Sequence, residues 1–210
     1  MAFGGSSPPI VGQTEEYNGS TWASNPTGLN TGRRYLGGCG TQTAALGFGG
    51  TPPTTGATEE YDGSTWTTSP GTLNTARDAL AGCGTQTAAL AFGGYTGTAN
   101  TGATEEYDGT SWTSNPTGLN TARSQFAGAG IQTAALAFGG NLPPNTAATE
   151  EYDGSTWTTS PASLATAKNS LAGAGTQTAG LAFAGYDTAN SVTTEEWTGA
   201  GPVTKTITAS

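Results

Sequence analysis

The sequence predicts an all-β fold, a five-bladed β-propeller, from an internal repeat, from its turn signals and from the lack of helical periodicity. A Glu-Glu pair recurs at Glu15-Glu16, Glu59-Glu60, Glu105-Glu106, Glu150-Glu151 and Glu195-Glu196. Successive copies lie 44, 46, 45 and 45 residues apart, a period typical of solenoids, propellers and other repeat arrays. Apolar residues show no helical spacing, and the abundant Gly and Thr disfavour helix.

Each repeat predicts four short strands. In one copy the first strand is Leu80–Gly84, rich in Gly and Ala, and the second is Thr87–Phe92. The third strand is Ala103–Tyr107, and the fourth surrounds Trp112. Asp-Gly or Asn-Gly separates the third strand from the fourth, which is a strong hairpin signal. Four strands in a unit of this length are typical of a propeller blade.

The chain is predicted to be one domain over residues 1–210. A partial blade over residues 1–24 lacks its inner strand, and full blades follow at about residues 35–67, 79–113, 125–158 and 170–208. Val203 to Thr208 alternates like a strand and is interpreted as the fourth strand of the last blade. Alternatively, the tail or another chain supplies the missing inner strand of the first blade. Gly and Ala on the inner strands suit a narrow channel, and ring closure would remove most exposed strand edges.

The repeat resembles the kelch repeat, in which a Gly pair ends the second strand, a Tyr and a Trp follow, and an Arg precedes the next first strand. Here these positions are Gly93-Gly94, Tyr107, Trp112 and Arg123. They recur as Gly4-Gly5, Tyr17, Trp22 and Arg33, as Gly49-Gly50, Tyr61, Trp66 and Arg77, and as Gly139-Gly140, Tyr152, Trp157 and Lys168. The last copy departs from the pattern, with Ala184-Gly185 and Trp197.

The resemblance implies a kelch-like propeller. Nearly identical units rich in Thr, Gly and Ala look like the kelch-type repeats of phage and environmental bacterial surface proteins. This likeness implies a virion or extracellular protein, such as a decoration, fibre or receptor-binding element. The implied partners are other chains of a particle or surface assembly, or glycans, and a homo-oligomer is one possibility.

Charge and hydropathy exclude several classes of partner. The net charge is −9 and the isoelectric point about 4.2, so we expect no binding to nucleic acid or to anionic membranes by charge. We expect no membrane insertion, because no apolar run approaches the roughly 20 residues that a span needs. The start, Met1 to Gly5, shows no signal peptide.

Histidine is absent from the sequence, which removes the commonest general base and the commonest metal ligand. We therefore predict a protein that is not an enzyme and has no zinc site or other cofactor. Two alternatives stay open: an enzyme that uses carboxylates alone, and a Ca²⁺ site built from the repeated carboxylates. Cys39 and Cys83 hold the same place in successive units, as small buried thiols or, less simply, as a disulfide.

The Glu-Glu pairs predict a structural ring of salt bridges, because neighbours on a strand point to opposite faces and one Glu of each pair faces inward. The expected ring joins Glu16, Glu60, Glu106, Glu151 and Glu196 to Arg33, Arg77, Arg123 and Lys168 between the blades.

Residues that are not repeated are the better candidates for binding, because sites in propellers lie on loops at the channel mouths. Tyr95 and Tyr186 follow their Gly pairs directly and either stack on a sugar ring or pack on their own loops. Further candidates near the first strands are Arg34, Tyr35, Asp78, Gln125 and Asn169. We therefore predict a non-enzymatic binding or structural module, with a lectin that carries one weak site per blade as the alternative.

Overall fold

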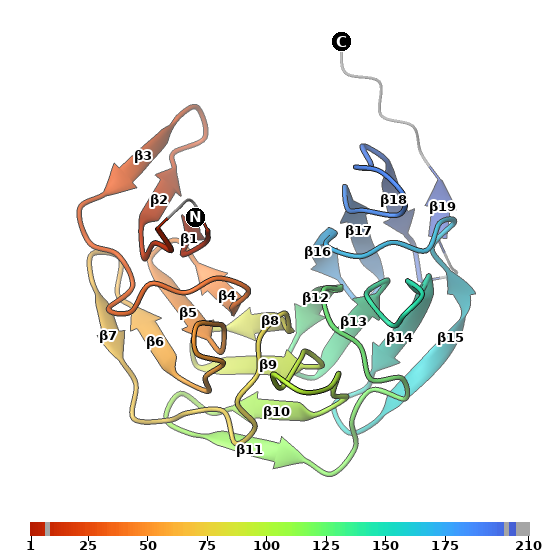
Figure 1. The fold of residues 1–210 in the computed structure, drawn as a ribbon, viewed down its shortest axis with the longest axis horizontal. Coiled ribbons are helices and arrows are strands. Elements are labelled where there is room, and N and C mark those ends of the chain that lie inside the picture. The colour runs from red at the N-terminus through yellow and green to blue at the C-terminus, as the bar shows by residue number, and fades with distance from the viewer. Residues whose placement is uncertain (7–8, 200–201, 205–210) are drawn as a thin grey trace.

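The computed structural model describes residues 1–6, 9–199 and 202–204, and within them it contains strands, turns and no helix. Five antiparallel sheets stand around a common centre as the blades of a propeller (Figure 1). The predicted fold class, all-β with five blades, is confirmed.

The first blade has three strands and the others have four. Blade 1 contains β1 (Ala2–Phe3), β2 (Thr14–Tyr17) and β3 (Trp22–Asn25). Blade 2 contains β4 (Gly37–Thr41), β5 (Ala44–Phe48), β6 (Thr58–Tyr61) and β7 (Trp66–Thr68). Blade 3 contains β8 (Ala81–Thr85), β9 (Ala88–Phe92), β10 (Thr104–Tyr107) and β11 (Trp112–Asn115). Blade 4 contains β12 (Ala127–Ile131), β13 (Ala134–Phe138), β14 (Ala148–Tyr152) and β15 (Trp157–Ser163), and blade 5 contains β16 (Ala172–Thr176), β17 (Ala179–Phe183), β18 (Thr194–Trp197) and β19 (Pro202–Thr204).

The outer hairpin of each blade forms where the Asp-Gly and Asn-Gly signals predict it. In blade 3 the loop from Asp108 to Ser111 joins β10 to β11, and Tyr107 lies opposite Trp112. The Asp108 carboxylate accepts hydrogen bonds from the backbone N–H groups of Thr110 and Ser111, both at 2.8 Å. The loop is therefore longer than a two-residue turn, and the Asp side chain closes it.

The two ends of the chain agree with the sequence-based interpretation. Blade 1 lacks an inner strand, as predicted, since β1 pairs only with β2 in the described residues. The tail forms the outer strand of blade 5, because β19 pairs with β18 over Pro202 to Thr204. The rest of the predicted tail strand, residues 205–208, lies outside the described residues.

Aromatic rings hold neighbouring blades together. Phe48 of blade 2 contacts Trp112 of blade 3 edge-on, with ring centroids 4.9 Å apart. The same Phe48 ring lies against the inner strand of blade 3, where a Cβ built on Gly82 would lie 2.3 Å from Phe48 Cζ. The indole Nε1 of Trp112 donates to Thr58 Oγ1 of blade 2 at 2.9 Å. Phe, Trp and the inner Gly meet in this way at the interfaces after blades 1, 2 and 3, whereas after blade 4 Phe138 meets the inner Gly173 and the sequence has no Trp at the equivalent place.

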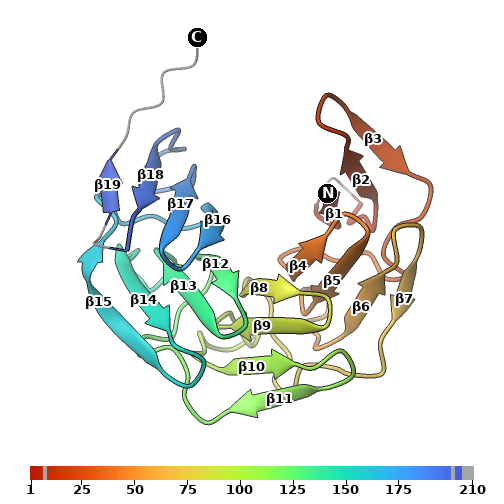
Figure 2. The same cartoon turned by 180° about the vertical axis from the view of Figure 1, so that it is seen from behind.

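The ring is open between blades 1 and 5, with β2 and β3 on one side of the opening and β16 to β18 on the other (Figures 1 and 2). Trp22 of blade 1 is 55% exposed, whereas its equivalent Trp66 is 5% exposed. Phe183 of blade 5 is 37% exposed, whereas its equivalent Phe48 is fully buried. The described residues therefore do not form the ring closure expected from the sequence, because they include no blade that would cover both faces of the opening.

We predict that Gly82→Ala destabilises the protein and that Gly180→Ala does not. The added methyl at Gly82 meets the Phe48 ring at 2.3 Å, and overpacking of this kind costs about 1–3 kcal/mol. At Gly180 the nearest atom is the end of the flexible Leu136 side chain at 3.1 Å, and the equivalent blades carry Ala there. Urea unfolding measures the difference, and equal loss in both variants would contradict this packing.

Candidate functional site

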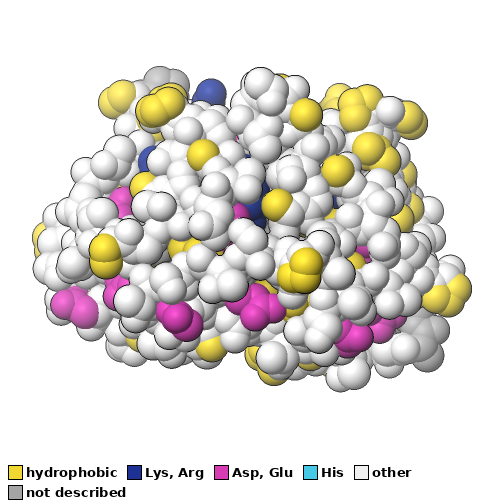
Figure 3. Space-filling view, turned by 90° about the horizontal axis from the view of Figure 1, so that it is seen from below, with side chains coloured by type: hydrophobic (Ala, Val, Ile, Leu, Met, Phe, Trp, Pro, Cys, Tyr) yellow, Lys and Arg dark blue, Asp and Glu magenta, His cyan; other side chains and the backbone are white. Residues whose placement is uncertain are grey.

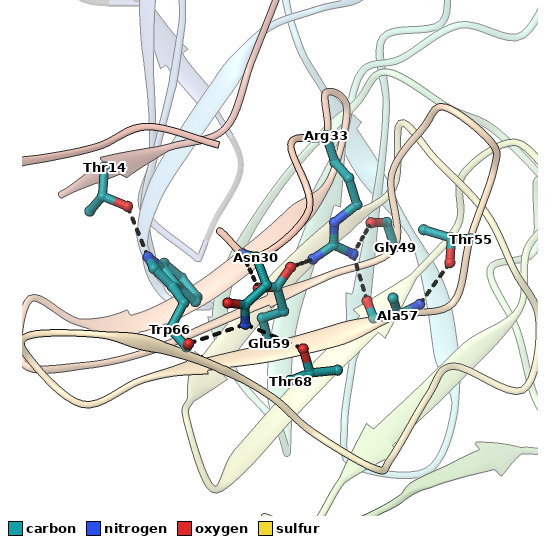
Figure 4. A network of polar contacts seen from close by, with 9 residues as sticks. All are labelled: Thr14, Asn30, Arg33, Gly49, Thr55, Ala57, Glu59, Trp66 and Thr68. Atoms are coloured by element: carbon teal, nitrogen blue, oxygen red, sulfur yellow. Dashed lines mark hydrogen bonds and ion pairs between the residues drawn. The ribbon is translucent and has the colours of Figure 1, made fainter. Parts of the chain in front are cut away.

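A buried ion pair joins each linker to the blade that follows it. In the first copy Arg33 Nη2 donates to Glu59 Oε1 at 2.8 Å (Figure 4). Arg33 Nη1 also donates to the carbonyl oxygens of Gly49 and Ala57, both at 2.8 Å. The second oxygen of Glu59 accepts a hydrogen bond from the backbone N–H of Asn30 at 2.6 Å. The two charged side chains are only 1% and 3% exposed, so the pair belongs to the core.

The same pair recurs in the other linkers, but it uses a different carboxylate from the one the sequence predicted. The pairs are Arg77–Glu105 at 2.6 Å, Arg123–Glu150 at 2.8 Å and Lys168–Glu195 at 3.3 Å. The expected ring of Glu16, Glu60, Glu106, Glu151 and Glu196 was therefore wrong, because in the last four pairs the first Glu contacts the cation. Strand alternation separates the two carboxylates, but the sequence does not show which face of the strand meets the linker.

The second Glu of a pair binds the tyrosine of the next blade instead. Tyr61 OH donates to Glu16 Oε1 at 2.5 Å, and Tyr107 OH donates to Glu60 Oε1 at 2.5 Å. Burial and these hydrogen bonds raise the pKa of both tyrosines to about 12. The hydrogen bond from Tyr61 in turn lowers the pKa of Glu16.

The remaining second glutamates follow the same placement. Glu106 Oε1 accepts from Tyr152 OH at 2.6 Å, while Glu151 and Glu196 hold the equivalent places in β14 and β18. Glu16, Glu60 and Glu106 thus join neighbouring blades through a tyrosine hydroxyl.

A glutamine at the inner hairpin joins each blade to the one before it, and the sequence analysis missed this residue. Gln86 Nε2 donates to the carbonyl oxygens of Ala45 at 3.0 Å and Tyr61 at 2.7 Å, both in blade 2. Gln132 and Gln177 make the equivalent bonds in blades 4 and 5. The recurrence of Gln-Thr after the inner strand of each four-stranded blade was the available signal.

A ladder of backbone hydrogen bonds fixes one mouth of the propeller. Tyr35, Ala79, Gln125 and Ser170 precede the inner strands and have positive φ angles of 56°, 50°, 52° and 53°. The N–H of Ala79 donates to Tyr35 O at 2.7 Å, and the N–H of Gln125 donates to Ala79 O at 2.9 Å. Ser170 N–H continues the ladder to Gln125 O at 2.7 Å. Left-handed backbone at these non-glycine residues costs roughly 1–2 kcal/mol each, and the ladder holds it in place.

A pocket of about 320 Å³ lies at this mouth, over blades 2 to 4. Its lining residues are Tyr35, Asp78, Ala79, Tyr95, Asn100, Ser124, Gln125, Asn141 and Pro143. Tyr35 is 54% exposed and Tyr95 is 37% exposed, so both rings present a face to a ligand. Asp78 and Tyr95 bond to each other through their backbones at 2.9 and 2.8 Å, which fixes the main chain of both residues at the rim.

Four of the seven binding candidates from the sequence meet around this pocket: Tyr35, Asp78, Tyr95 and Gln125. Arg34 lies beside it, with its guanidinium 5.2 Å from the Tyr35 ring centroid. Asn169 and Tyr186 hold the equivalent places in blade 5 and bond to each other outside the pocket.

The sequence analysis missed the two asparagines of the pocket, Asn100 and Asn141. Asn100 Nδ2 donates to Asn141 O at 3.0 Å, and so joins the loops of blades 3 and 4. Asn141 follows its Gly pair directly, as Tyr95 does, so alignment of the repeats would have identified it. Asn100 lies in a loop whose length differs between the repeats, so alignment of the repeats does not identify it as a pocket residue.

The site offers hydrogen bonding and aromatic stacking, and it contains one carboxylate, that of Asp78. Asp78 Oδ2 accepts a hydrogen bond from Thr54 Oγ1 at 3.0 Å. Within the described ranges, no three His, Cys, Asp or Glu side chains are grouped so that they could hold a metal ion. Acidic side chains form a row near one rim, and few basic atoms appear on that face (Figure 3).

The two cysteines are free thiols, not a disulfide. Burial raises the pKa of Cys39 to about 12 and also raises the pKa of Cys83. Thiols of this kind are mostly protonated and therefore poor nucleophiles at neutral pH.

We predict that Glu105→Gln destabilises the protein far more than Glu106→Gln. The first variant leaves the buried Arg77 guanidinium without its counter-charge, which costs about 3–5 kcal/mol. The second keeps an oxygen that accepts the hydrogen bond from Tyr152, and it should cost less than about 1 kcal/mol. Chemical unfolding measures both values, and the reverse order would restore the pairing expected from the sequence.

The raised pKa values of the tyrosines predict a loss of stability at alkaline pH. Tyr61 and Tyr107 ionise near their ordinary value of 10.0 when unfolded but near 12 when folded. Their contribution is therefore complete below pH 10 and disappears as the pH rises to about 12. Urea unfolding at several pH values across this interval measures the slope. The double variant Tyr61→Phe/Tyr107→Phe should show a smaller slope, and an unchanged slope would contradict the assignment.

Comparison with known proteins identifies no family for the chain. No model of a known protein family matches it. A search among curated proteins finds no similar sequence. In the part of the chain that the structure describes, no helix has the length and hydropathy that a membrane crossing requires. The fold and the mouth pocket are therefore the basis for inferring what the protein does.

Proposed function

We propose that the protein is a non-enzymatic binding module that takes a glycan in the mouth pocket. The observation that carries this proposal is the pairing of two exposed tyrosine rings, Tyr35 and Tyr95, with fixed polar groups around one hollow. Sugar rings stack on aromatic faces, and their hydroxyl groups bond to carboxylate and amide side chains. The volume of about 320 Å³ lies at the lower end of the roughly 300–1,000 Å³ of small-molecule sites.

The rigidity of the mouth supports a binding role. The ligand-facing residues stand on the backbone ladder and on the Asp78–Tyr95 bridge, so binding orders few additional groups. The repeated ionisable side chains are engaged in contacts within and between blades, as in the Arg77–Glu105 pair and the Tyr107–Glu60 hydrogen bond. Repeated residues therefore hold the blades together, and unrepeated residues are available to bind a ligand.

We further propose that the repeat is of the kelch type and that the protein works on a virion or another extracellular surface. The structure gives the resembling residues the roles that a blade needs: the Gly pair ends the second strand, Tyr and Trp meet across the outer hairpin, and the linker cation anchors the next blade. The setting rests on the likeness of these near-identical units to repeats of phage and environmental surface proteins.

We predict that Tyr95→Ala and Tyr35→Ala each weaken glycan binding by about fivefold, since loss of one stacking contact removes roughly 1 kcal/mol. Tyr186→Ala is the matched control, because this tyrosine is 46% exposed but lies outside the pocket. A glycan array identifies the ligand, and calorimetry with that glycan measures the three variants. Absence of any bound glycan, or an equal loss in Tyr186→Ala, would overturn the proposal.

A further inference from the structure

The bridge between Asp78 and Tyr95, at the rim of the mouth pocket, brings a carboxylate beside an exposed aromatic ring. We propose that this pair binds a protonated amine, so that the ligand of the pocket is a glycan that carries an unacetylated amino sugar. The inference rests on the proposed glycan function and adds to it the chemical group that the pocket selects. Three observations carry it: the register of the bridge, the charges around the pocket, and the copies of the bridge in other blades.

The backbone register places the two side chains on the same side. Asp78 N–H donates to Tyr95 O at 2.9 Å, and Tyr95 N–H donates to Asp78 O at 2.8 Å, so the two residues lie directly opposite each other. Opposed residues of an antiparallel pair project to one face, with Cβ atoms about 4.5–5.5 Å apart. Both residues line the pocket, so this face is the one that a ligand meets. One group of the ligand can therefore contact the carboxylate and the ring together.

The Asp78 carboxylate is held in position but has no counter-charge. Its Oδ2 accepts a hydrogen bond from Thr54 Oγ1 at 3.0 Å, while Oδ1 has no hydrogen-bond partner among the described residues. The ion pairs in the described part of the chain are the four buried linker pairs, and none of them includes Asp78. A neutral hydroxyl orients the carboxylate without compensating its charge. A cationic group of the ligand would supply that compensation.

The charges around the pocket favour a cation on the side of blade 3. Asp78 is the one charged residue among the described residues that line the pocket. The face of a tyrosine ring attracts a cation, and Tyr95 offers such a face beside the carboxylate. Arg34 already holds its guanidinium 5.2 Å from the centroid of the Tyr35 ring. Because like charges repel, an ammonium group is directed away from Tyr35 and toward Asp78 and Tyr95.

Blade 5 contains the same bridge without the charge. Asn169 and Tyr186 exchange two backbone hydrogen bonds at 2.9 and 2.8 Å, as Asp78 and Tyr95 do. The side chain of Asn169 also bonds to the preceding loop, where its Nδ2 donates to Asn145 Oδ1 at 2.8 Å. The backbone arrangement therefore forms equally well with an amide in place of the carboxylate. The charge of Asp78 is not needed to build the bridge and is available to bind a ligand.

The combination of carboxylate and aromatic ring occurs once among the bridges of this mouth. The two remaining bridges pair Arg34 with Thr51 and Ser124 with Asn141. Neither of them contains a carboxylate or an aromatic ring. We therefore expect one ammonium site per chain, unlike the one site per blade of a lectin built on the repeat.

An amino sugar suits the remaining chemistry of the pocket. An ammonium group has three donors, which suit carboxylate and carbonyl oxygens. The ring that carries it can stack on tyrosine, and its hydroxyl groups can bond to the amides of Asn100 and Asn141. Acetylation would remove the charge of the amine, and an acidic sugar would bring a second carboxylate to Asp78. The pocket should therefore rank amino sugars above neutral sugars, and neutral sugars above acidic ones.

The test compares β1,4-linked tetramers of glucosamine and of glucose, at a pH at which the amines are protonated. On each ring the two probes differ by an ammonium or a hydroxyl group. By titration calorimetry with the full chain, we expect the glucosamine tetramer to bind about fivefold more tightly, at one per chain. This ratio is the size expected of one partly exposed ion pair with a cation–π contact. Tetramers of galactosamine and galactose form a second pair of probes, because the inference does not specify the ring configuration.

Two variants with the same change of net charge locate the contact. Asp78→Asn keeps the size of the side chain and removes its charge, so the ratio of the two affinities should fall to about one. Asp187→Asn is the matched control, because Asp187 follows Tyr186 in the equivalent loop of blade 5, outside the pocket. Its Oδ1 accepts from the N–H of Ala189 at 3.0 Å, which an amide oxygen also does. The ratio should remain about fivefold in this variant, and equal loss in both variants would overturn the site.

The outcomes separate this inference from the proposed function. If the neutral sugars bind as tightly as the amino sugars, the ammonium site is overturned and the glycan function stands. Tetralysine is a further probe, which carries amines without a sugar. If tetralysine binds in a manner that Asp78→Asn abolishes and no sugar binds, the ammonium contact stands but the glycan function is overturned. If neither the amino sugars nor tetralysine bind, the inference is overturned, whereas a neutral glycan found on the array would keep the proposed function.

Discussion

The buried pair between a linker cation and a blade carboxylate is the interaction on which the rest of the structure depends. Arg33 bonds to Glu59 and also to the carbonyl oxygens of Gly49 and Ala57, at the two ends of one loop. Asn30 in the linker bonds to the same carboxylate. One desolvated pair thus fixes the linker, the loop and the third strand together, and removal of either partner leaves a charge in the core.

This pair also explains how a chain with few large aliphatic residues forms a packed ring. The buried cations fill volume between blades, and the rings of Phe48 and Trp112 cover the inner Gly82. Each buried cation is paired with a buried glutamate, so the buried pairs carry no net charge. The excess of 15 acidic over 6 basic residues therefore lies outside these pairs, and part of it forms the acidic row in Figure 3.

The sequence predicted the features that repeat along the chain and missed those that depend on how blades meet. Strand bounds near Thr104–Tyr107, the missing inner strand and the outer position of Pro202–Thr204 follow from period and turn chemistry. The choice of Glu105 over Glu106 depends on which face of a strand turns toward the linker, which alternation alone leaves undecided. The repeat pattern gives no sign that Trp22 and Phe183 are exposed, and Asn100 reaches the pocket through a loop of irregular length.

The ladder through Tyr35, Ala79, Gln125 and Ser170 holds the blades in place through backbone bonds, while the side chains of these residues remain available to a ligand. Its bonds join main-chain atoms only, and the four side chains already differ in size and chemistry. A substitution at these positions changes what faces a ligand and leaves the register of the blades intact. Loops beside the ladder change length in the same way. Related chains can therefore diversify their specificity by a few changes at one mouth while the energetic core of each blade stays constant.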